Sequence, residues 1–459
     1  MIPTVFAHGI VQRADLPIPE AVFAWASAAV LVVSFVILAA FWPDPKLEGE
    51  GHWRPLGSRF MQALVSTPVR FACGLIGVGL LVVTIWTGFA GVQTPAANLA
   101  PTFVYVIFWN GLVALSLFFG DIFRAFNPWG AVGKAVAWVS EKAAGQPMPA
   151  PMKYPERLGY WPAAVGLFLF AALELVVDDG NLPRNVAIGT LIYSALTWLG
   201  MTLYGIDAWL NRGEAFSVYF NLFSRISPFE VRDGKLGIQP PLAGLARLSV
   251  GPGIVAVVVT MIGSVTFDGF KEGPIFTGWT DNLSHFWHSL GFSLKHSLEL
   301  TNLVGLIGCV GVIGGFYLLG IKGAQSIGGG FTTTRLARSF AHTLVPIALA
   351  YVSAHYLTQL LFQGQAFAFL ASDPLGHGSD LFGTADATID YGVIGAKATW
   401  YWQVGFVVVG HVAGLTLAHD RALTLYDKAR LAVRSQYWML GVMVGFTCLA
   451  LWLLSQANT

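Results

Sequence analysis

Charged residues are scarce in this sequence. Only 11% of its 459 residues are Asp, Glu, Lys or Arg, whereas soluble globular proteins average about 25%. Hydrophobic residues make up 55% of the chain, and the mean hydropathy is +0.63. This composition excludes an ordinary soluble globule and indicates an integral membrane protein whose main partner is the lipid bilayer.

Cysteine, net charge and common catalytic motifs are scarce as well. The three cysteines fall inside hydrophobic runs without a CxxC spacing, which argues against a disulfide framework and a thiolate metal cluster. A net charge of +1 with no basic tail argues against a nucleic-acid partner. The HExxH, GxSxG and P-loop patterns are also absent from the sequence, so it carries none of these signatures of zinc peptidases, serine hydrolases or nucleotide-binding proteins.

Long hydrophobic runs are abundant and predict an all-α fold, a polytopic bundle of transmembrane helices. A helix needs about 20 apolar residues to cross a bilayer. Ten runs approach this length, over residues 20–42, 71–92, 101–120, 159–177, 186–210, 249–267, 298–320, 338–362, 400–419 and 436–455. We therefore expect a single integral membrane domain over residues 1–459.

Lysine and arginine are distributed unequally between the connections of these runs. Of the 26 in the chain, 21 fall in one alternating set, residues 42–70, 121–157, 211–247, 321–338 and 420–435. Because cytoplasmic loops carry the excess of basic residues, this set is predicted to face the cytoplasm. Both termini are then predicted to lie on the outer side. An even number of spans agrees with this, because it places both termini on the same side.

The connections differ in character. The inner loops 121–157 and 211–247 mix aromatic with basic residues, which is typical of amphipathic helices at a membrane surface. The outer loops 268–297 and 363–399 contain most of the polar residues of the outer side. Within the second run, Gly74, Gly77 and Gly79 permit close helix approach.

Half of the ten histidines fall between Arg338 and Ala422. They are His342 and His355 in the eighth run, His377 in the following loop, and His411 and His419 in the ninth. Imidazoles inside a bilayer cost free energy unless they face a partner, water or a metal. We expect these side chains either to carry cofactor or metal chemistry or to satisfy one another structurally.

Haem is not favoured by the spacing of these histidines. Two haems would require matched pairs on facing helices. The 13 residues from His342 to His355 turn a helix by about 220° beyond complete turns, so the two side chains point to different sides. His355 and His411 also differ in depth by about 10 Å on a rise of about 1.5 Å per residue. A single haem between His342 and His419 stays open.

The outer side contains further candidate ligands. Glu174 and Asp268 end the fourth and sixth runs, where solvated helix ends are the alternative interpretation. His285 and His288 lie in the next segment, followed by His296 and Glu299. On one continuous helix all four would share a face about 80° wide, which suits a metal.

That outer segment has a second interpretation. Its histidine face would be about 21 Å long, so one ion could use only a neighbouring pair such as His285 with His288. Gly291 would break the helix between the pairs. An amphipathic interfacial helix is the alternative to a metal site here, and His8 near the N-terminus is a further candidate ligand.

Six stretches carry a resemblance to a known family. They are AHGIVQRADLPIP (7–19), LGYWPAAVGLFLFAALELV (158–176), FSRISPFEVRDGKL (223–236), FAHTLVPIALAYVSAHYL (340–357), SDPLGHGSDLFGTADATIDY (372–391) and VGHVAGLTLAHDRAL (409–423). Over nearly its whole length the chain resembles bacterial polytopic membrane proteins commonly labelled fenitrothion hydrolase. The resemblance implies the bacterial inner membrane, cleavage of organophosphate esters, and a core of Asp268, His342, His355, Asp373, Asp380, Asp386, Asp390, His411, His419 and Asp420. The cluster His285, His288 and His296 is not part of that pattern.

Hydrolysis of such an ester needs an activated water, which a bound divalent metal, zinc or copper, can supply near neutral pH. We expect a catalytic centre of His355, Asp373 and Asp380 near the outer face. The metal would be bound by residues drawn from His355, Asp268, Asp373, Glu174, His411, His285 and His288.

Two other classes of function remain open. Intramembrane His and Asp residues also line proton and metal paths, and ten spans can divide into two halves of inverted topology, as in transporters. His342, His411, His419 and Asp420, spread toward the inner side, fit this class better than the hydrolase. The third class is a non-catalytic membrane subunit, which would assemble with other membrane proteins.

Overall fold

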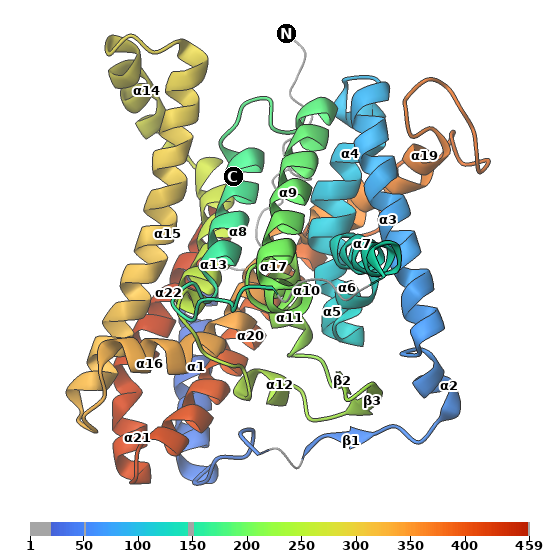
Figure 1. Cartoon of the computed structure of the whole chain (residues 1–459). Coiled ribbons are helices and arrows are strands. Elements are labelled where there is room, and N and C mark those ends of the chain that lie inside the picture. The colour runs from blue at the N-terminus through green and yellow to red at the C-terminus, as the bar shows by residue number, and fades with distance from the viewer. Residues whose placement is uncertain (1–19, 50–51, 146–150, 458–459) are drawn as a thin grey trace.

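The computed structural model describes residues 20–49, 52–145 and 151–457, most of which are helical (Figure 1). Within these residues, seven helical stretches are long and apolar enough to cross a membrane, and an eighth is added if a bent pair is one span. Two shorter apolar helices, Trp25–Phe41 and Trp161–Leu175, account for the remaining hydrophobic runs. The structure is therefore largely helical and contains helices suited to a membrane, while the count of ten spans stays a prediction.

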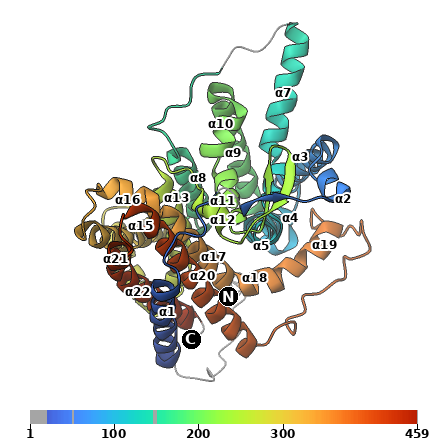
Figure 2. The same cartoon turned by 90° about the horizontal axis from the view of Figure 1, so that it is seen from below.

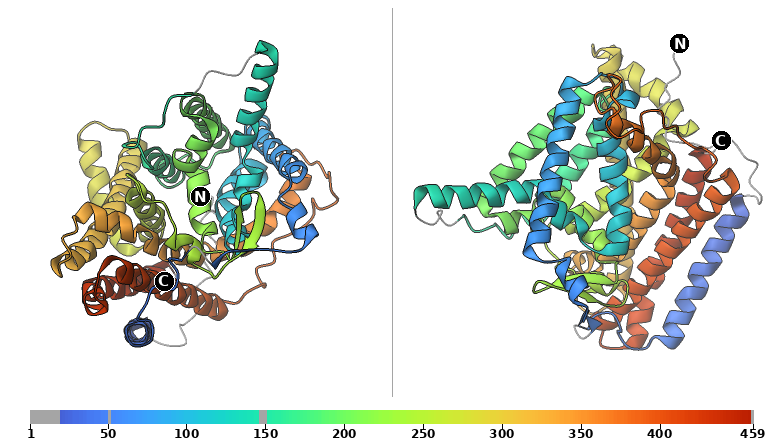
Figure 3. Two further views of the ribbon diagram at one scale, coloured as in Figure 1. Left: turned by 60° about the horizontal axis from the view of Figure 1, so that its bottom comes forward. Right: turned by 90° about the vertical axis from the view of Figure 1, so that its right-hand side faces the viewer.

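The long helices form the bundle. They are α1 (Glu20–Phe41), α3 (Thr67–Ala90), α8 (Trp161–Leu175), α9 (Pro183–Tyr204), α13 (Ile254–Lys271), α15 (Leu294–Ser326), α20 (Ala396–Leu425) and α22 (Tyr437–Ala457). The stretch Leu99–Phe119 is composite, with α4 (Leu99–Thr102), the π-helical η3 (Phe103–Gly111) and α5 (Leu112–Phe119). At the edge of the bundle α1 stands against α20 and α22 (Figure 3).

Helix α13 is the centre of the bundle. In its membrane-length window 78% of the residues are buried, against 22–44% in the other six stretches. It packs against α8, α15 and α22, and against α17 (Val345–His355). A helix that is apolar on all sides, as IVAVVVTMIGSVTF is, must be surrounded by protein or lipid, and here it is surrounded by protein.

The stretch expected as one span over 338–362 is bent and longer than predicted. It contains α16 (Thr333–Phe340), η4 (Ala341–Leu344) and α17, and continues through α18 (Leu357–Phe362), η5 (Gln363–Gln365) and α19 (Ala366–Ser372). The two halves meet at an angle of 57°, at the break that follows His355. The break leads α19 away from α13, and the two helices lie well apart in both views (Figures 1 and 2).

A small antiparallel sheet departs from the expected all-α class. Its strands β1 (Arg54–Pro55), β3 (Lys235–Ile238) and β2 (Phe229–Arg232) lie in that order, with Arg54 and Phe229 both opposite Ile238. Positive φ angles at Asp233 and Gly234 make the tight turn between β2 and β3, and Asp-Gly is the residue pair that such hairpins prefer.

The two inner loops differ from one another. The helix α7 (Pro128–Ala144) extends sideways from the bundle with Val136 and Val139 exposed, as an amphipathic surface helix would (Figures 2 and 3). By contrast, α11 (Ala215–Ser224) is buried over most of its length, because its phenylalanines pack with Trp109 and Phe108 in an aromatic cluster. The expected amphipathic loop 211–247 thus contributes a core helix.

The remaining helices are short connections or surface elements. They are α2 (Arg59–Ala63), η2 (Pro95–Ala97), α6 (Ile122–Phe126), α10 (Ile206–Arg212), α12 (Ala243–Ala246), α14 (Pro274–Ser289) and α21 (Ala429–Ser435).

Gly77 on α3 provides a test of helix packing. A Cβ at this position would lie 1.9 Å from the carbonyl oxygen of Phe126 on α6, whereas a Cβ at Gly79 meets nothing within 4 Å. We expect Gly77→Ala to destabilise the protein by about 1–3 kcal/mol or more, the usual cost of overpacking. Gly79→Ala should be neutral or slightly stabilising, because alanine favours helix. Thermal melting of the two variants in detergent checks this, and equal melting temperatures would contradict the close contact.

Candidate functional site

Asp268 and His355 form a buried pair between two bundle helices. Asp268, near the end of α13, is completely buried, and its Oδ2 lies 3.0 Å from Nε2 of His355 at the end of α17. The hydroxyl of Tyr356 donates to the same oxygen at 2.9 Å. Since a buried carboxylate is stable only with hydrogen-bonding or charged partners, the pair and the tyrosine form one unit, called the Asp268 site below.

The break between α17 and α18 positions this site. His355 is the last residue of α17 and Tyr356 lies in the break, so both side chains can turn toward α13. Their rings contact edge to face, with centroids 4.7 Å apart. An unbroken helix would separate adjacent residues by about 100° around its axis, which makes a shared contact on one oxygen difficult.

Glu174 lies at the margin of the same site. It is near the end of α8, which packs on α13, and it is partly exposed. Its carboxylate interacts electrostatically with the phenols of Tyr356, Tyr219 and Tyr105. The predicted proximity of Glu174 to the Asp268 site therefore agrees with this arrangement.

A small cavity adjoins His355. Its volume is about 20 Å³, and it is lined by Tyr351 and His355 of α17, Thr266 of α13 and Val407 of α20, among others. A cavity of this size holds one water molecule. Val407, one of its lining residues, also accepts at its carbonyl oxygen from Nδ1 of His411 at 2.7 Å.

His411 and His342 continue this series of buried imidazoles. The ring of His411 lies 6.4 Å from that of Tyr351, and both histidines are completely buried. Within the part of the chain that the structure describes, Nε2 of His411 has no hydrogen-bond partner, whereas the ring of His342 hydrogen-bonds with the backbone of Ser339. Buried polar atoms without partners are costly and rare, so Nε2 of His411 requires an explanation beyond packing.

On the side predicted to be inner, His419 and Asp420 hold chain segments together. Asp420 accepts from Nε1 of Trp42 at 2.9 Å and from the backbone N–H groups of Lys46 and Leu47 at 2.6 and 3.0 Å. His419 contacts the carbonyl oxygen of Trp42 at 3.0 Å and the amide of Gln436. With both ring nitrogens engaged, His419 has none left for a haem iron. These two residues anchor the connection after α1 to α20 and α22.

The acidic outer loop does not join the Asp268 site. Asp373 accepts from the backbone of His377 and Gly378 and from the Ser379 hydroxyl, and Asp380 accepts from the backbone of Ala385. The position of His355 at the end of the eighth hydrophobic run predicted that the loop would lie close to it. In the structure α18, η5 and α19 lie between His355 and the loop and lead the loop away. The predicted centre of His355 with Asp373 and Asp380 is not assembled within the described contacts, so sequence proximity to the end of a span was a misleading guide.

The histidines of the segment 285–296 do not form one cluster, and no described contact joins them to the Asp268 site. His285 and His288 are exposed on α14, and His288 contacts the carbonyl oxygen of Phe292. The helix ends at Ser289, Gly291 has a φ of +94°, and His296 belongs to α15, 3.5 Å from Glu299. The anticipated break at Gly291 therefore removes the common face that a metal site along this segment would need. His8 lies outside the described residues.

A metal ion does not fit the described ligand set. Across residues 20–49, 52–145 and 151–457, no three His, Cys, Asp or Glu side chains converge on one point. Zinc sites use at least three protein ligands, whereas the Asp268 site brings together only one carboxylate and one imidazole. The metal-binding roles of His355, Asp268, Asp373, Glu174, His411, His285 and His288 stay predictions, and no chemical step below depends on a metal.

A large apolar cavity adjoins α8. It has a volume of about 880 Å³ and is bounded by α3, η3, α8, α9 and α11. Tyr105 belongs to its wall, as does Leu173, which precedes Glu174 in the sequence. An apolar molecule of drug size fits such a volume.

The sequence revealed the carboxylate and the histidine of the site but not its tyrosines. Tyr356 directly follows His355, and Tyr351 precedes it by four residues, which places Tyr351 and His355 on one helix face. A phenol beside an intramembrane histidine was the available signal for both.

No family model, curated protein or solved structure matches the chain.

The hydrogen bonds of Asp373 predict an acid-sensitive loop. Slight burial works against ionisation, but the bonds from Gly378, Ser379 and His377 lower the pKa of Asp373 below its usual value. The stabilisation is therefore present above the ordinary aspartate pKa of about 3.9 and is lost as pH falls through the lowered value. We expect Asp373→Ala to speed proteolytic cleavage within residues 373–384 at neutral pH. The exposed Asp386→Ala is the control, and equal cleavage rates would contradict this role.

Proposed function

We propose that this membrane protein transfers protons through the buried groups that begin at the Asp268 site, as part of proton-coupled transport. One observation carries the proposal: Nε2 of His411 is buried without a hydrogen-bond partner within the described residues, in the same bundle as the hydrogen-bonded Asp268–His355 pair. Intramembrane ionisable residues mark proton relays when nothing structural explains them.

The chemistry suits imidazole. A neutral histidine accepts a proton at one nitrogen and releases one from the other. A proton arriving at His355 would be stabilised by the Asp268 carboxylate, and one water in the adjoining cavity would connect it toward Tyr351 and His411. His342 lies about 20 Å from His355 along the chain axis on a rise of about 1.5 Å per residue, so these groups cover much of a bilayer core.

The proposal includes ten spans with both termini outside the cytoplasm. The support is the uneven distribution of the 26 basic residues, which predicts that Gly234 faces the cytoplasm and Ser379 the outer side. Topology reporters fused at these two positions should give opposite signals. A signal from the outer side at Gly234 would overturn the orientation.

Proton transfer is tested in sealed vesicles. Purified protein in proteoliposomes that contain a pH-sensitive dye, with a membrane potential imposed by potassium and valinomycin, should acidify faster than empty vesicles. His355→Ala, Asp268→Asn and His411→Ala should each slow acidification at least about tenfold, since loss of a general acid–base group typically costs this much or more. His285→Ala, an exposed outer histidine, should match the wild type. Wild-type vesicles no faster than empty ones would refute the proposal.

A second candidate is hydrolysis of apolar organophosphate esters, which the family resemblance implies. The large apolar cavity that contains Tyr105 and Leu173 in its wall favours it, because an apolar ester fits a volume of this size. In this case His355, activated by Asp268, would take the proton of an attacking water.

Variants of His355 and His419 test whether hydrolysis takes place at the Asp268 site or near His419. His355→Ala should abolish organophosphate turnover while the protein remains folded. His419→Ala should leave turnover largely unchanged, because His419 is on α20 and contacts Trp42 and Gln436, not the Asp268 site. Turnover is measured by release of the phenolic product. Loss of activity in His419→Ala with full activity in His355→Ala would move the function to the inner side.

A further inference from the structure

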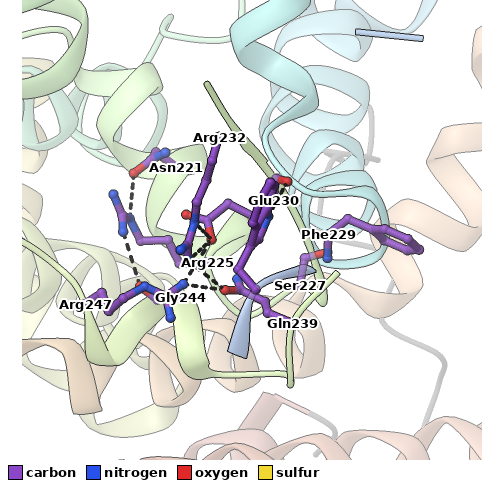
Figure 4. Close-up of polar contacts among 10 residues, drawn as sticks. Asn221, Arg225, Ser227, Phe229, Glu230, Arg232, Gln239, Gly244 and Arg247 are labelled. Atoms are coloured by element: carbon purple, nitrogen blue, oxygen red, sulfur yellow. Dashed lines mark hydrogen bonds and ion pairs between the residues drawn. The ribbon is translucent and has the colours of Figure 1, made fainter. Parts of the chain in front are cut away.

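Arginines gather where the β2–β3 hairpin meets α11 and α12, on the side predicted to be cytoplasmic. The group, called the arginine cluster below, consists of Arg225, Arg232 and Arg247 with Glu230 and Gln239 (Figure 4). All three guanidinium groups are only partly exposed. Figure 4 shows them converging on a small region between the hairpin and the segment after α12.

A single carboxylate serves two of these arginines. Oε2 of Glu230 accepts from Arg232 at 2.7 and 2.9 Å and from Arg247 at 3.0 Å. Both arginines also donate to the neutral side-chain oxygen of Gln239. One negative charge therefore faces two positive charges, in surroundings that water reaches only partly.

Arg225 adds a third positive charge without a direct carboxylate partner in the described contacts. Its Nε donates to Oδ1 of Asn221 at 2.9 Å, and its Nη1 donates to the carbonyl oxygen of Gly244 at 3.2 Å. The nearest carboxylate in this network, Asp121, is reached only through Asn221, which donates to it at 2.8 Å. The cluster thus retains an excess of positive charge.

Arg247 shows the consequence of that excess. Its side chain is only 16% exposed, and its Nη1 is buried with no partner in the part of the chain that the structure describes. Burial lowers the pKa of Arg247, Glu230 offsets part of this effect, and the nearby charges of Arg232 and Arg225 lower it further. A buried N–H of a cation that lacks an acceptor is costly, so the site favours an additional anion.

The surroundings of the cluster contain exposed apolar side chains. Val231 and Ile238 of the hairpin and Val250 after α12 are 51%, 41% and 44% exposed, and Trp53 lies against the guanidinium of Arg232 at 5.4 Å. Basic groups beside exposed apolar and tryptophan side chains are typical of protein at the level of lipid headgroups.

We propose that the arginine cluster binds the phosphate of an anionic phospholipid on the cytoplasmic face. Guanidinium groups match the geometry of phosphate oxygens through paired N–H donors, and the partly exposed Arg225 and Arg232 supply such donors beside Arg247. The acyl chains would lie along the exposed Val231, Ile238 and Val250. The phosphate neutralises the charge that Glu230 alone leaves uncompensated.

Lipid retention by the full-length protein tests this site. Protein in nanodiscs that contain equal phosphatidylglycerol and phosphatidylcholine is extracted, and retained lipid is counted by native mass spectrometry. Wild type should retain phosphatidylglycerol preferentially. Arg247→Gln and Arg225→Gln should each weaken retention about tenfold, the effect of one charge-assisted hydrogen bond. Lys235→Gln is the matched control, because this exposed lysine of the same hairpin loses the same charge.

Several outcomes would overturn the proposal. Equal retention of the two lipids by wild type would do so without any variant, and so would an equal loss of phosphatidylglycerol in Lys235→Gln and Arg247→Gln. Stabilisation of wild type by millimolar inorganic phosphate, with no preference for phosphatidylglycerol, would overturn the lipid assignment in favour of a free anion. The measured quantities are the amount of retained phospholipid and the melting temperature, so the test is independent of proton transfer.

Discussion

The completely buried carboxylate of Asp268 is the constraint on which the centre of this structure depends. In a medium of low dielectric constant, an ionised carboxylate is stable only if donors or cations surround it. The donors here come from α17 and from the break that follows it. The packing of α13 against α17, and the position of the break in the eighth hydrophobic run, are therefore tied to one side chain.

The same requirement explains the Asp420 end of the bundle. Asp420 is buried too, and three N–H groups after α1 satisfy it. The Asp268 site adjoins a cavity large enough for one water, which Tyr351 also lines. The two buried aspartates thus have different surroundings: Asp420 is held mainly by donors of one chain connection, whereas Asp268 is held by side chains of a neighbouring helix beside a small cavity.

The sequence predicted the helices and part of the site. Run length identified the membrane helices, depth brought Asp268 and His355 to the same level, and the glycines of α3 indicated close contact that Gly77 makes with Phe126. The tyrosines had one available signal, a phenol close in sequence to an intramembrane histidine. The burial of α11 and the failure of Asp373 to reach His355 were not predictable in this way. They depend on a 57° bend and on side-chain packing between distant segments, neither of which has a local sequence signal. The Asp233-Gly234 turn did have one, and it identifies the hairpin in retrospect.

Hydrogen-bond satisfaction, and not residue type, separates the intramembrane histidines by role. Both ring nitrogens of His419 have hydrogen-bond partners in the surrounding chain. Its role is therefore explained by these structural contacts. His411 has Nε2 without a partner within the described residues, although its ring is equally buried. A fold that needed only a flat, polar filler at that position could use a side chain with fewer polar atoms at lower cost. In His411, Nδ1 donates to the carbonyl oxygen of Val407, so within the described residues Nε2 is the atom of this imidazole that the surrounding chain leaves unsatisfied.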